Sequence, residues 1–271
     1  MIRKTLKRTK EATFAILFPN PHHHGMPTPT GTGFFVSPDG WFVTAAHVMK
    51  ENGRSDGPIR NDISKALLMK ETRICEGGDP FPIMLGGLSF DYLDDFSDFA
   101  LLKMEYKYNS KTDWLKDKTE FPYIEISIRG LEEGEPVYSF GYPLPEIFSK
   151  ELQCMKIGHS ALCPRVTSAI IASTFEKGKM IMTSNDLKVY VLDKALNYGN
   201  SGGPIIATET GKVHAFCSRF QPVAIPQRHL GDKQGNYPSI MIPSLYGIVT
   251  SISNQPILQK LIEKNIPFSE K

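Results

Sequence analysis

No apolar run in this sequence approaches the length of a membrane span, which needs about 20 consecutive residues. The strongest candidate near the N-terminus, residues 12–18, is far shorter. It follows a basic start, as the core of a secretory signal would, but Pro19 and Pro21 come after it in place of small residues suited to cleavage. We therefore predict neither a membrane span nor a signal peptide, and we expect residues 12–18 to form the first strand.

The sequence also lacks an excess of charge of either sign. Its 271 residues include 31 lysines and arginines and 29 acids, a formal net charge of +2. This balance does not favour nucleic-acid binding, and no nucleic-acid partner is predicted. Basic residues do cluster at the start, because residues 1–10 contain several of them and no acid. We expect a solvated basic arm there.

Cysteine is scarce, and the spacing of metal-binding pairs is missing. None of the four cysteines belongs to the C-x-x-C pattern of zinc or redox sites; they are Cys75, Cys154, Cys163 and Cys217. Three consecutive histidines occupy residues 22–24, but successive side chains of an extended segment point to opposite faces and chelate a metal poorly. The sequence predicts no metal and no cofactor, and a solvent-exposed loop at 19–30.

One stretch stands out, Tyr-Gly-Asn-Ser-Gly-Gly-Pro at residues 198–204. Glycine tolerates backbone angles that other residues avoid and Pro204 has no N–H, so the stretch predicts a tight, exposed turn. Such a turn can hold the Ser201 hydroxyl forward while the N–H groups of Gly199 and Ser201 point into one concavity. A nucleophile and its oxyanion site need this arrangement. An ordinary glycine-rich loop is the alternative.

A histidine upstream can supply the base that a serine nucleophile requires. Short apolar runs at 34–36 and 41–43 flank Ser-Pro-Asp-Gly, which predicts a hairpin. The hairpin delivers His47 just past the end of a strand. Imidazole is the natural base for a hydroxyl because it titrates near neutral pH in peptides. A structural histidine is the alternative for His47 considered alone.

The third member of such a site is a carboxylate that orients the imidazole. Asp98 comes immediately before the dense apolar run 99–102, which predicts a buried strand. A charge at the mouth of a buried strand is costly unless it has a partner. We therefore prefer Asp98 to Asp94 and Asp95, which lie in a more polar run. The alternative is that all three are surface acids.

Four blocks together resemble the chymotrypsin-like serine proteases. They are Thr-Gly-Thr-Gly-Phe-Phe-Val (30–36), Val-Thr-Ala-Ala-His-Val (43–48), Asp-Phe-Ala-Leu-Leu (98–102) and Gly-Asn-Ser-Gly-Gly-Pro (199–204). They are most similar to the bacterial trypsin-like peptidases of the HtrA type. The blocks span most of the chain, and their order His, Asp, Ser is the order that this fold uses.

This resemblance implies a role for each site residue. His47 would be the general base, Asp98 would orient it, Ser201 would attack, and the N–H groups of Gly199 and Ser201 would form the oxyanion hole. Ala195 stands where trypsin-type enzymes carry the acid that selects Lys or Arg, so small or medium apolar residues are expected before the scissile bond. The strand around Ser218 would pair with the substrate backbone, with the insertion 221–238 near the same pocket.

The serine block also fits the G-x-S-x-G pattern of α/β-hydrolases. That fold needs a helix after the serine and the order Ser, acid, His. Here Pro204 and two glycines follow the serine, and the only later histidines are His214 and His229, with Glu209 as the sole acid before His214. The pattern disfavours this alternative.

Many short β-rich segments without alternating long helices predict an all-β protein. The resemblance sharpens this to two six-stranded antiparallel β-barrels with a short C-terminal helix. We expect a basic arm at 1–10, a first barrel at 11–118 with His47 and Asp98, a second barrel at 119–250 with Ser201, and a helix and tail at 251–271. No room is expected for the PDZ module of HtrA-type relatives.

The sequence therefore predicts a serine endopeptidase that acts on a protein or peptide substrate through an acyl-enzyme. The competing interpretations are a latent or catalytically silent protease-fold protein that binds or regulates, and an esterase. Val48 stands where animal digestive relatives carry a cysteine beside the catalytic histidine, which favours a reduced, cytoplasmic setting, although the even number of cysteines leaves disulfides open. The oligomeric state is left open.

Overall fold

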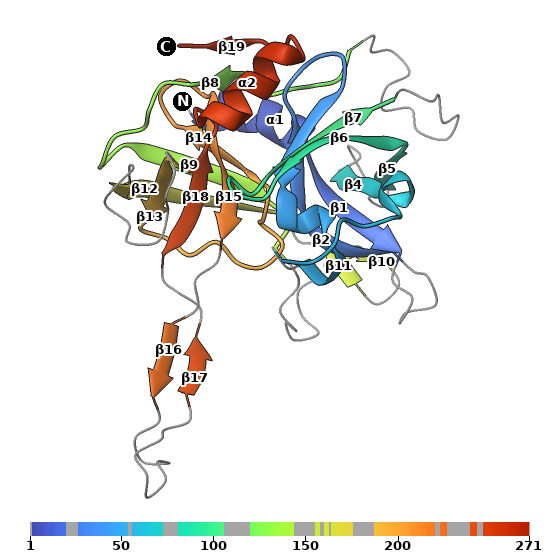
Figure 1. Cartoon of the computed structure of the whole chain (residues 1–271), viewed down its shortest axis with the longest axis horizontal. Helices are drawn as coiled ribbons and strands as arrows, with labels where there is room; N and C mark the ends of the chain where they lie inside the picture. Colours follow the sequence, from blue (N-terminus) through green and yellow to red (C-terminus); the bar gives the residue numbers. More distant parts are fainter. Residues whose placement is uncertain are drawn as a thin grey trace, which may run out of the picture.

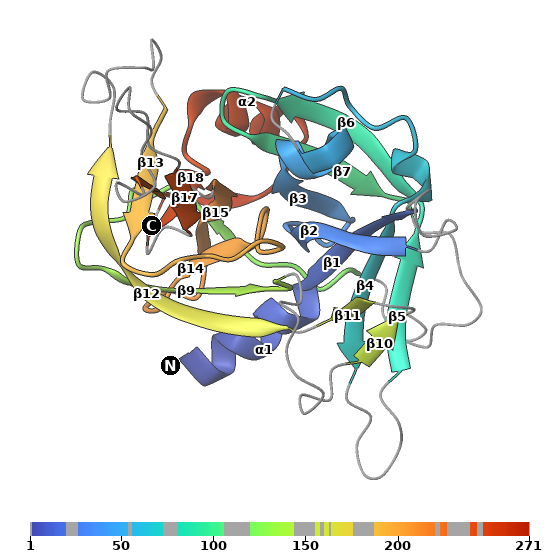
Figure 2. The ribbon, with the colours of Figure 1, turned by 90° about the horizontal axis from the view of Figure 1, so that it is seen from below.

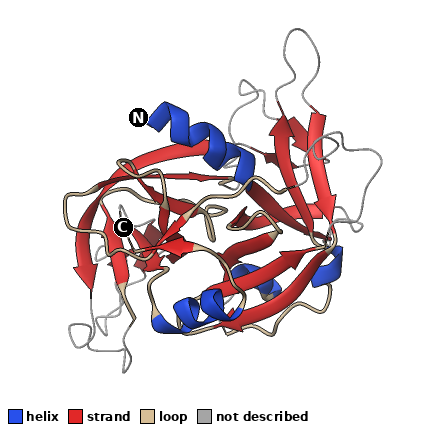
Figure 3. Cartoon of the chain, turned by 90° about the horizontal axis from the view of Figure 1, so that it is seen from above, coloured by secondary structure: helices blue, strands red, loops and turns tan. Residues whose placement is uncertain are grey.

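The computed structural model describes residues 2–19, 27–53, 56–72, 81–105, 120–143, 155–157, 160–162, 164–175, 187–219, 223–226, 239–242 and 246–270. Strands dominate these residues, as Figure 3 shows. The helices are α1 (Ile2–Ala12), α2 (Gln255–Glu263) and three 3-10 turns, η2 (Ala46–Met49), η3 (Glu51–Gly53) and η4 (Ile63–Lys65). The fold is all-β, as the sequence predicts.

The first sheet contains seven strands in the order β5-β4-β1-β2-β3-β7-β6 (Figure 1). They are β1 (Thr13–Pro19), β2 (Pro27–Phe35), β3 (Trp41–Ala45), β4 (Leu67–Thr72), β5 (Phe81–Gly86), β6 (Leu88–Asp94) and β7 (Phe99–Met104). Six strands were expected. Seven are present, with β5 and β6 as the two edge strands; Gly87, with φ +96°, lies between them in the chain, and this left-handed conformation favours glycine.

The second sheet closes on itself. Its order is β14-β9-β12-β13-β18-β15-β8-β19, and β14 also pairs with β15, so that six strands form a ring (Figure 2). The strands are β8 (Ile126–Ser127), β9 (Pro136–Gly141), β12 (Arg165–Phe175), β13 (Val189–Leu192), β14 (Pro204–Ala207), β15 (Val213–Arg219), β18 (Gly247–Ser251) and β19 (Phe268–Ser269). This ring is the predicted six-stranded second barrel.

Two small antiparallel sheets complete the described strands. One joins β10 (Met155–Ile157) to β11 (Ser160–Leu162), and the other joins β16 (Val223–Pro226) to β17 (Ser239–Ile242). The β16–β17 ribbon projects from the second barrel (Figure 1). Strand β17, just after the insertion 221–238, thus pairs with β16 inside it, while β18 continues the barrel. The three consecutive histidines at 22–24 lie outside the described residues.

Strand β1 is buried along nearly all of its length because apolar side chains cover both of its faces. Phe14, Ile16 and Phe18 belong to the largest core cluster, whereas Ala15 and Leu17 pack with Phe140 and Tyr142 of the second barrel. A strand buried on both faces has a continuous apolar run instead of alternation. This burial explains why residues 12–18 resemble a short signal core.

Helix α1 occupies the stretch expected as a basic arm. It rests on the second barrel, where the Tyr138 hydroxyl donates to Thr5 Oγ1 at 2.9 Å. Arg8 Nη1 forms an ion pair of 2.8 Å with Glu125, and Leu6 packs against the largest core cluster. Its charged residues therefore lie on a helix that is docked on one face. Among the described residues, neither this helix nor any other has the length and apolarity to cross a membrane.

Helix α2 corresponds to the expected C-terminal helix. Ile257 and Leu261, four residues apart and hence on one helical face, are fully buried in the largest core cluster. Asn254 precedes the helix, and its amide oxygen accepts a hydrogen bond from the Lys188 N–H at 2.6 Å. The helix thus packs on the core and is tied to the chain leading into β13.

Candidate functional site

His47 and Asp98 lie at the same end of two neighbouring antiparallel strands of the first sheet, β3 and β7. His47 lies in η2, directly after β3, and Asp98 lies in the turn between β6 and β7. Nδ1 of His47 is 2.9 Å from Asp98 Oδ2 and 3.0 Å from Oδ1, and the His47 backbone N–H donates to Oδ1 at 3.0 Å. The Asp98 side chain is 5% exposed and the imidazole 19%. The carboxylate therefore holds both the ring and the backbone of the histidine.

The backbone at Asp98 is in an uncommon conformation, with φ +54°. A non-glycine residue in this region is strained unless its surroundings fix it. Here the Ala46 N–H donates to the Asp98 carbonyl at 2.8 Å. Preceding it, the Asp94 carboxylate accepts from the N–H of Ser97 at 3.1 Å and from the Ser97 hydroxyl. The turn thus directs the Asp98 carboxylate toward His47.

The two acids considered as alternatives to Asp98 have other partners. Asp94 caps its own turn, as just described, and Asp95 forms an ion pair with Lys50. Among the described residues, Asp98 is the acid that contacts the His47 ring. Asp98 is also the acid that its position before a buried strand predicts for this role.

Ser218 supplies a contact that the sequence did not predict. Its hydroxyl donates to Asp98 Oδ2 at 2.8 Å, and the residue is buried. Ser218 belongs to β15 of the second barrel, at a register shift between Cys217 and Arg219 against β18. Such a bulge turns a side chain away from the regular alternation. The sequence pattern of β15 marked a strand but carried no signal for this bulge.

The serine turn lies between β13 and β14 and is held by Thr32 of β2. The Thr32 N–H donates to the Ser201 carbonyl at 2.8 Å, and Thr32 Oγ1 donates to the Gly199 carbonyl at 2.6 Å. Gly199 has φ +90° and Gly202 has φ +82°, conformations that favour glycine. The turn is therefore tight, as predicted, and it is docked on the first sheet near the end of the strand that leads to His47.

Gly202 has no room for a side chain. A Cβ on it would lie 2.2 Å from Thr44 Oγ1 and 2.3 Å from the Thr32 carbonyl oxygen. Contacts this short do not occur in real structures, and backbone atoms cannot move aside easily. The residue after the serine is thus glycine for reasons of both space and backbone angle.

The N–H groups of Gly199 and Ser201 are the expected oxyanion donors. Within the part of the chain that the structure describes, neither donates a hydrogen bond to another residue. Gly199 is buried and Ser201 is partly exposed, and both N–H groups, on either side of Asn200, are left without a partner among the described residues. An oxyanion site needs donors that are free in this way.

Ala195 lies in the segment between β13 and the serine turn and is partly exposed. The segment packs on the start of β18, since a Cβ on Gly247 would lie 2.9 Å from the Lys194 carbonyl and 3.1 Å from Leu196 Cγ. Leu196 is buried. Ala195, which is expected to influence the substrate side chain before the scissile bond, therefore lies between the exposed Lys194 and the buried Leu196.

Cys217 precedes Ser218 and is a free, buried cysteine. Burial raises the pKa of its thiol, and the negative charge of Asp98 raises it further. A thiol of this kind stays protonated and is a poor nucleophile. The other cysteines, Cys75, Cys154 and Cys163, fall outside the described residues.

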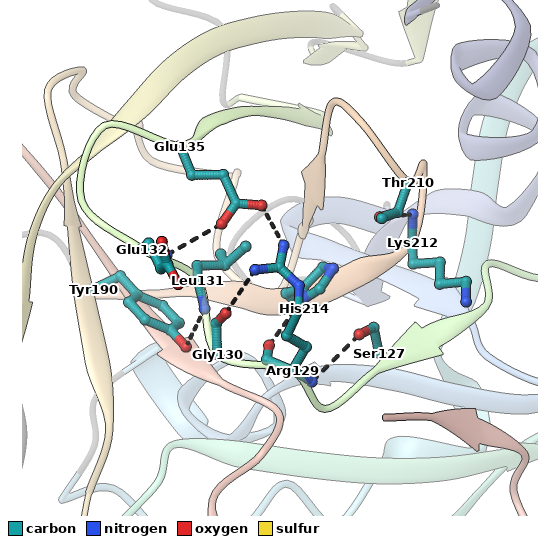
Figure 4. A network of polar contacts seen from close by, with 10 residues as sticks. All are labelled: Ser127, Arg129, Gly130, Leu131, Glu132, Glu135, Tyr190, Thr210, Lys212 and His214. Atoms are coloured by element: carbon teal, nitrogen blue, oxygen red, sulfur yellow. Dashed lines mark hydrogen bonds and ion pairs between the residues drawn. The ribbon is translucent and has the colours of Figure 1, made fainter. Parts of the chain in front are cut away.

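His214, one of the two histidines considered for the α/β-hydrolase alternative, belongs to a different network (Figure 4). Its Nδ1 lies 2.9 Å from the Arg129 carbonyl oxygen, and Arg129 pairs with Glu135. Burial lowers the pKa of His214, and the hydrogen bond to Arg129 only partly opposes this. His214 therefore contacts the second barrel's own backbone. The described residues contain no cluster of three or more possible metal ligands.

Comparisons with known proteins identify the family of this chain. A family model described as trypsin-like peptidase domain matches residues 31–215. The chain is 26% identical over 182 residues to serine protease HTRA1A of Danio rerio, an alignment that covers 67% of this chain and 28% of the relative. It is 25% identical over 183 residues to serine protease HTRA3 of Homo sapiens, covering 67% of this chain and 31% of the relative. The chain thus spans less than a third of the length of these relatives.

Solved structures show the same fold. The HtrA-type protease AlgW with tripeptide superposes with a TM-score of 0.54 at 17% identity, covering 98% of this chain and 65% of that one. AlgW with decapeptide gives a TM-score of 0.51 at 16% identity, covering 97% and 68%. At this level of identity the likeness concerns the fold.

Proposed function

Because this chain belongs to the trypsin-like peptidase domain family, whose model matches residues 31–215, we propose that it is a serine endopeptidase. Ser201 is the nucleophile, His47 the general base, and Asp98 the residue that orients the imidazole. The N–H groups of Gly199 and Ser201 bind the oxyanion. The substrate is a protein or peptide, and no cofactor takes part in this chemistry.

The observation that carries the proposal is the contact between Asp98 and Nδ1 of His47, at 2.9 and 3.0 Å. An ionised carboxylate only accepts hydrogen bonds, so Nδ1 carries the proton and Nε2 is left with a free electron pair. This tautomer is the one that can take a proton from a serine hydroxyl. The Ser218 hydroxyl supports it by donating to Asp98 Oδ2.

The reaction then follows from these groups. Nε2 of His47 takes the proton of Ser201 as Oγ bonds to the carbonyl carbon of the substrate, and the carbonyl oxygen gains negative charge. The N–H groups of Gly199 and Ser201 donate to this oxygen. The imidazolium returns the proton to the leaving amine, which breaks the C–N bond and leaves an acyl-enzyme. Water activated by His47 hydrolyses the ester and restores the serine.

Small or medium apolar residues are the proposed preference before the scissile bond. Ala195 brings no charge to the position that selects Lys or Arg in trypsin-type enzymes, and a cationic side chain would lose its hydration there without compensation. The relatives AlgW with tripeptide and AlgW with decapeptide are peptide complexes by description, which is compatible with an extended peptide as substrate.

Covalent labelling with a fluorophosphonate probe tests the proposal. The purified protein is expected to gain the mass of one adduct, and the Ser201→Ala variant none. Labelling of the variant would place the reactive group elsewhere, and no labelling of either protein would favour a latent or purely binding protein. Hydrolysis of an ester but of no peptide by the labelled enzyme would support an esterase.

A further inference from the structure

An ion pair joins the two chain segments that carry His47 and Asp98. Lys50 Nζ lies 2.6 Å from Asp95 Oδ1. Lys50 comes three residues after His47, and Asp95 comes three residues before Asp98. The pair therefore bridges the same two segments as the contact between His47 and Asp98.

The lysine side of this bridge is fixed by its surroundings. The Lys50 N–H donates to the His47 carbonyl at 3.2 Å and so closes η2. Its own carbonyl accepts from Arg60 Nε at 3.2 Å, and the Lys50 side chain is only 4% exposed. A lysine buried to this extent has few rotamers available. The position of its ammonium group beside η2 is therefore restricted.

The acid side of the bridge belongs to a compact turn. Asp95 follows Asp94, whose carboxylate accepts from the N–H groups of Phe96 and Ser97 at 3.3 and 3.1 Å. The same turn ends at Asp98 with its strained φ. Holding Asp95 therefore limits how the whole turn can move relative to η2.

Burying a lysine along its full length is unfavourable unless its charge is compensated. A surface ion pair elsewhere in the first sheet gives a direct comparison. Asp39 is 61% exposed, close to the 59% of Asp95, but its partner Lys103 is 28% exposed. The two acids are alike, and the difference is the buried lysine beside the site.

We propose that Lys50 and Asp95 are positioning residues for the reaction: their ion pair holds the turn that carries Asp98 against η2, so that the Asp98 carboxylate stays on Nδ1 of His47. This inference rests on the proposed function. Neither residue touches the reacting atoms, so the effect falls on the rate of the chemical step and not on binding.

The experiment compares Lys50→Met and Asp95→Asn with the wild type in their reaction with the fluorophosphonate probe. We expect kinact, the maximal rate constant of covalent labelling, to fall about tenfold in each variant. Misplacement of a catalytic group by a fraction of an ångström is enough for such a loss. KI, the probe concentration that gives half of this maximal rate, should stay within about twofold of the wild-type value, since the probe's binding contacts are intact. Asp95→Glu keeps the carboxylate and should recover most of the rate.

The pH profile of kinact separates positioning from simple charge effects. The two substitutions remove opposite charges, so an electrostatic effect through space would move the acidic limb in opposite directions. If instead Asp98 is held less firmly on His47, the imidazolium loses stabilisation. The acidic limb of the pH profile of kinact then moves to lower pH in both variants. A shift to higher pH in Lys50→Met would overturn the proposal.

Asp39→Asn is the matched control, because it removes an equally exposed carboxylate from an ion pair away from the site. It should label at the wild-type rate. Thermal unfolding of every variant checks that the fold persists. Equal rates for Lys50→Met, Asp95→Asn and the wild type would overturn the inference but leave the proposed function intact, whereas an unreactive wild type would overturn the proposed function itself.

Discussion

Thr32 and Gly199 are joined by a hydrogen bond of 2.6 Å that runs from the first sheet to the serine turn. Thr32 is completely buried and also holds the carbonyl of Ser201 through its own N–H. The two carbonyls that flank Asn200 are therefore fixed by one residue of β2. These carbonyls belong to the 199–200 and 201–202 peptide planes, which adjoin on the C-terminal side the planes that carry the N–H groups proposed for the oxyanion hole, and so restrict them.

Replacing Thr32 by Val tests this relationship. Valine keeps the shape of threonine but removes the hydroxyl, which leaves the Gly199 carbonyl unpaired and removes the acceptor of the Tyr142 N–H. We expect the rate of fluorophosphonate labelling to fall by about 10- to 100-fold, since oxyanion donors act only when aimed correctly. The measurement is kinact over KI at one pH.

Thr32→Ser is the control, because it retains the hydroxyl and loses only a methyl group. Its rate should stay within a few-fold of the wild type. Equal losses in Thr32→Ser and Thr32→Val would attribute the effect to packing and contradict the role given to the hydroxyl.

Replacing Ser218 by Ala removes a hydrogen-bond donor from buried Asp98. A hydrogen bond to a charged group contributes about 1.5 to 3 kcal/mol, so we expect a measurable loss of stability and a labelling rate reduced by about tenfold. Urea unfolding and the labelling rate are the two measurements. Ser168→Ala, at an exposed position of β12, should change neither, and an unchanged rate in Ser218→Ala would contradict the proposed support of Asp98.

Gly202→Ala should inactivate and destabilise the protein, because its Cβ would lie 2.2 Å from Thr44 Oγ1. Gly134→Ala separates this clash from backbone strain. Gly134 has φ +85°, and a Cβ there meets nothing within 4 Å. We expect a loss of about 1 to 2 kcal/mol for Gly134→Ala from strain alone, and more than about 4 kcal/mol for Gly202→Ala. Equal losses by urea unfolding would show that the predicted clash is relieved.

Stability should fall as the pH drops below about 6.5, the ordinary pKa of histidine. Burial lowers the pKa of His214, so the unfolded chain binds a proton in a pH range where the folded chain does not. The contribution of His214 is fully present above pH 6.5 and is lost as the pH falls toward the folded-state pKa. His214→Gln should flatten this slope in urea unfolding at pH 7.5, 6.5 and 5.5.

The comparison that matters is the difference between the wild type and His214→Gln at each pH. Other groups titrate in both proteins and cancel in this difference. A difference that stays constant from pH 7.5 to 5.5 would contradict the assignment of the slope to His214.

Local patterns predicted the parts of this fold that depend on neighbours in sequence. The apolar runs around Ser-Pro-Asp-Gly form the hairpin that leads to His47, and the run after Asp98 forms a buried strand. The burial argument preferred Asp98, and this is the acid in contact with the His47 ring, while its role in catalysis stays a prediction. The strand predicted at 12–18 is present as β1, Thr13–Pro19.

What the patterns could not predict depends on contacts between distant segments. Ser218 reaches Asp98 only because β15 carries a bulge at that point, and a single-residue register shift leaves no trace in apolar alternation. Thr32 belongs to the block 30–36, and nothing in the sequence indicates that it forms hydrogen bonds with Gly199 and Ser201. Nothing in the sequence around Lys50 predicts that its side chain is buried.

The contact between Ser218 and Asp98 has a consequence for the order in which the protein becomes active during synthesis. His47 and Asp98 are synthesised more than 100 residues before Ser201 and Ser218. The proposed base can therefore fold with its own sheet while the nucleophile and the last donor to Asp98 are still unmade. Because Ser218 reaches Asp98 from β15, the proposed site is complete only when the second barrel is docked on the first sheet.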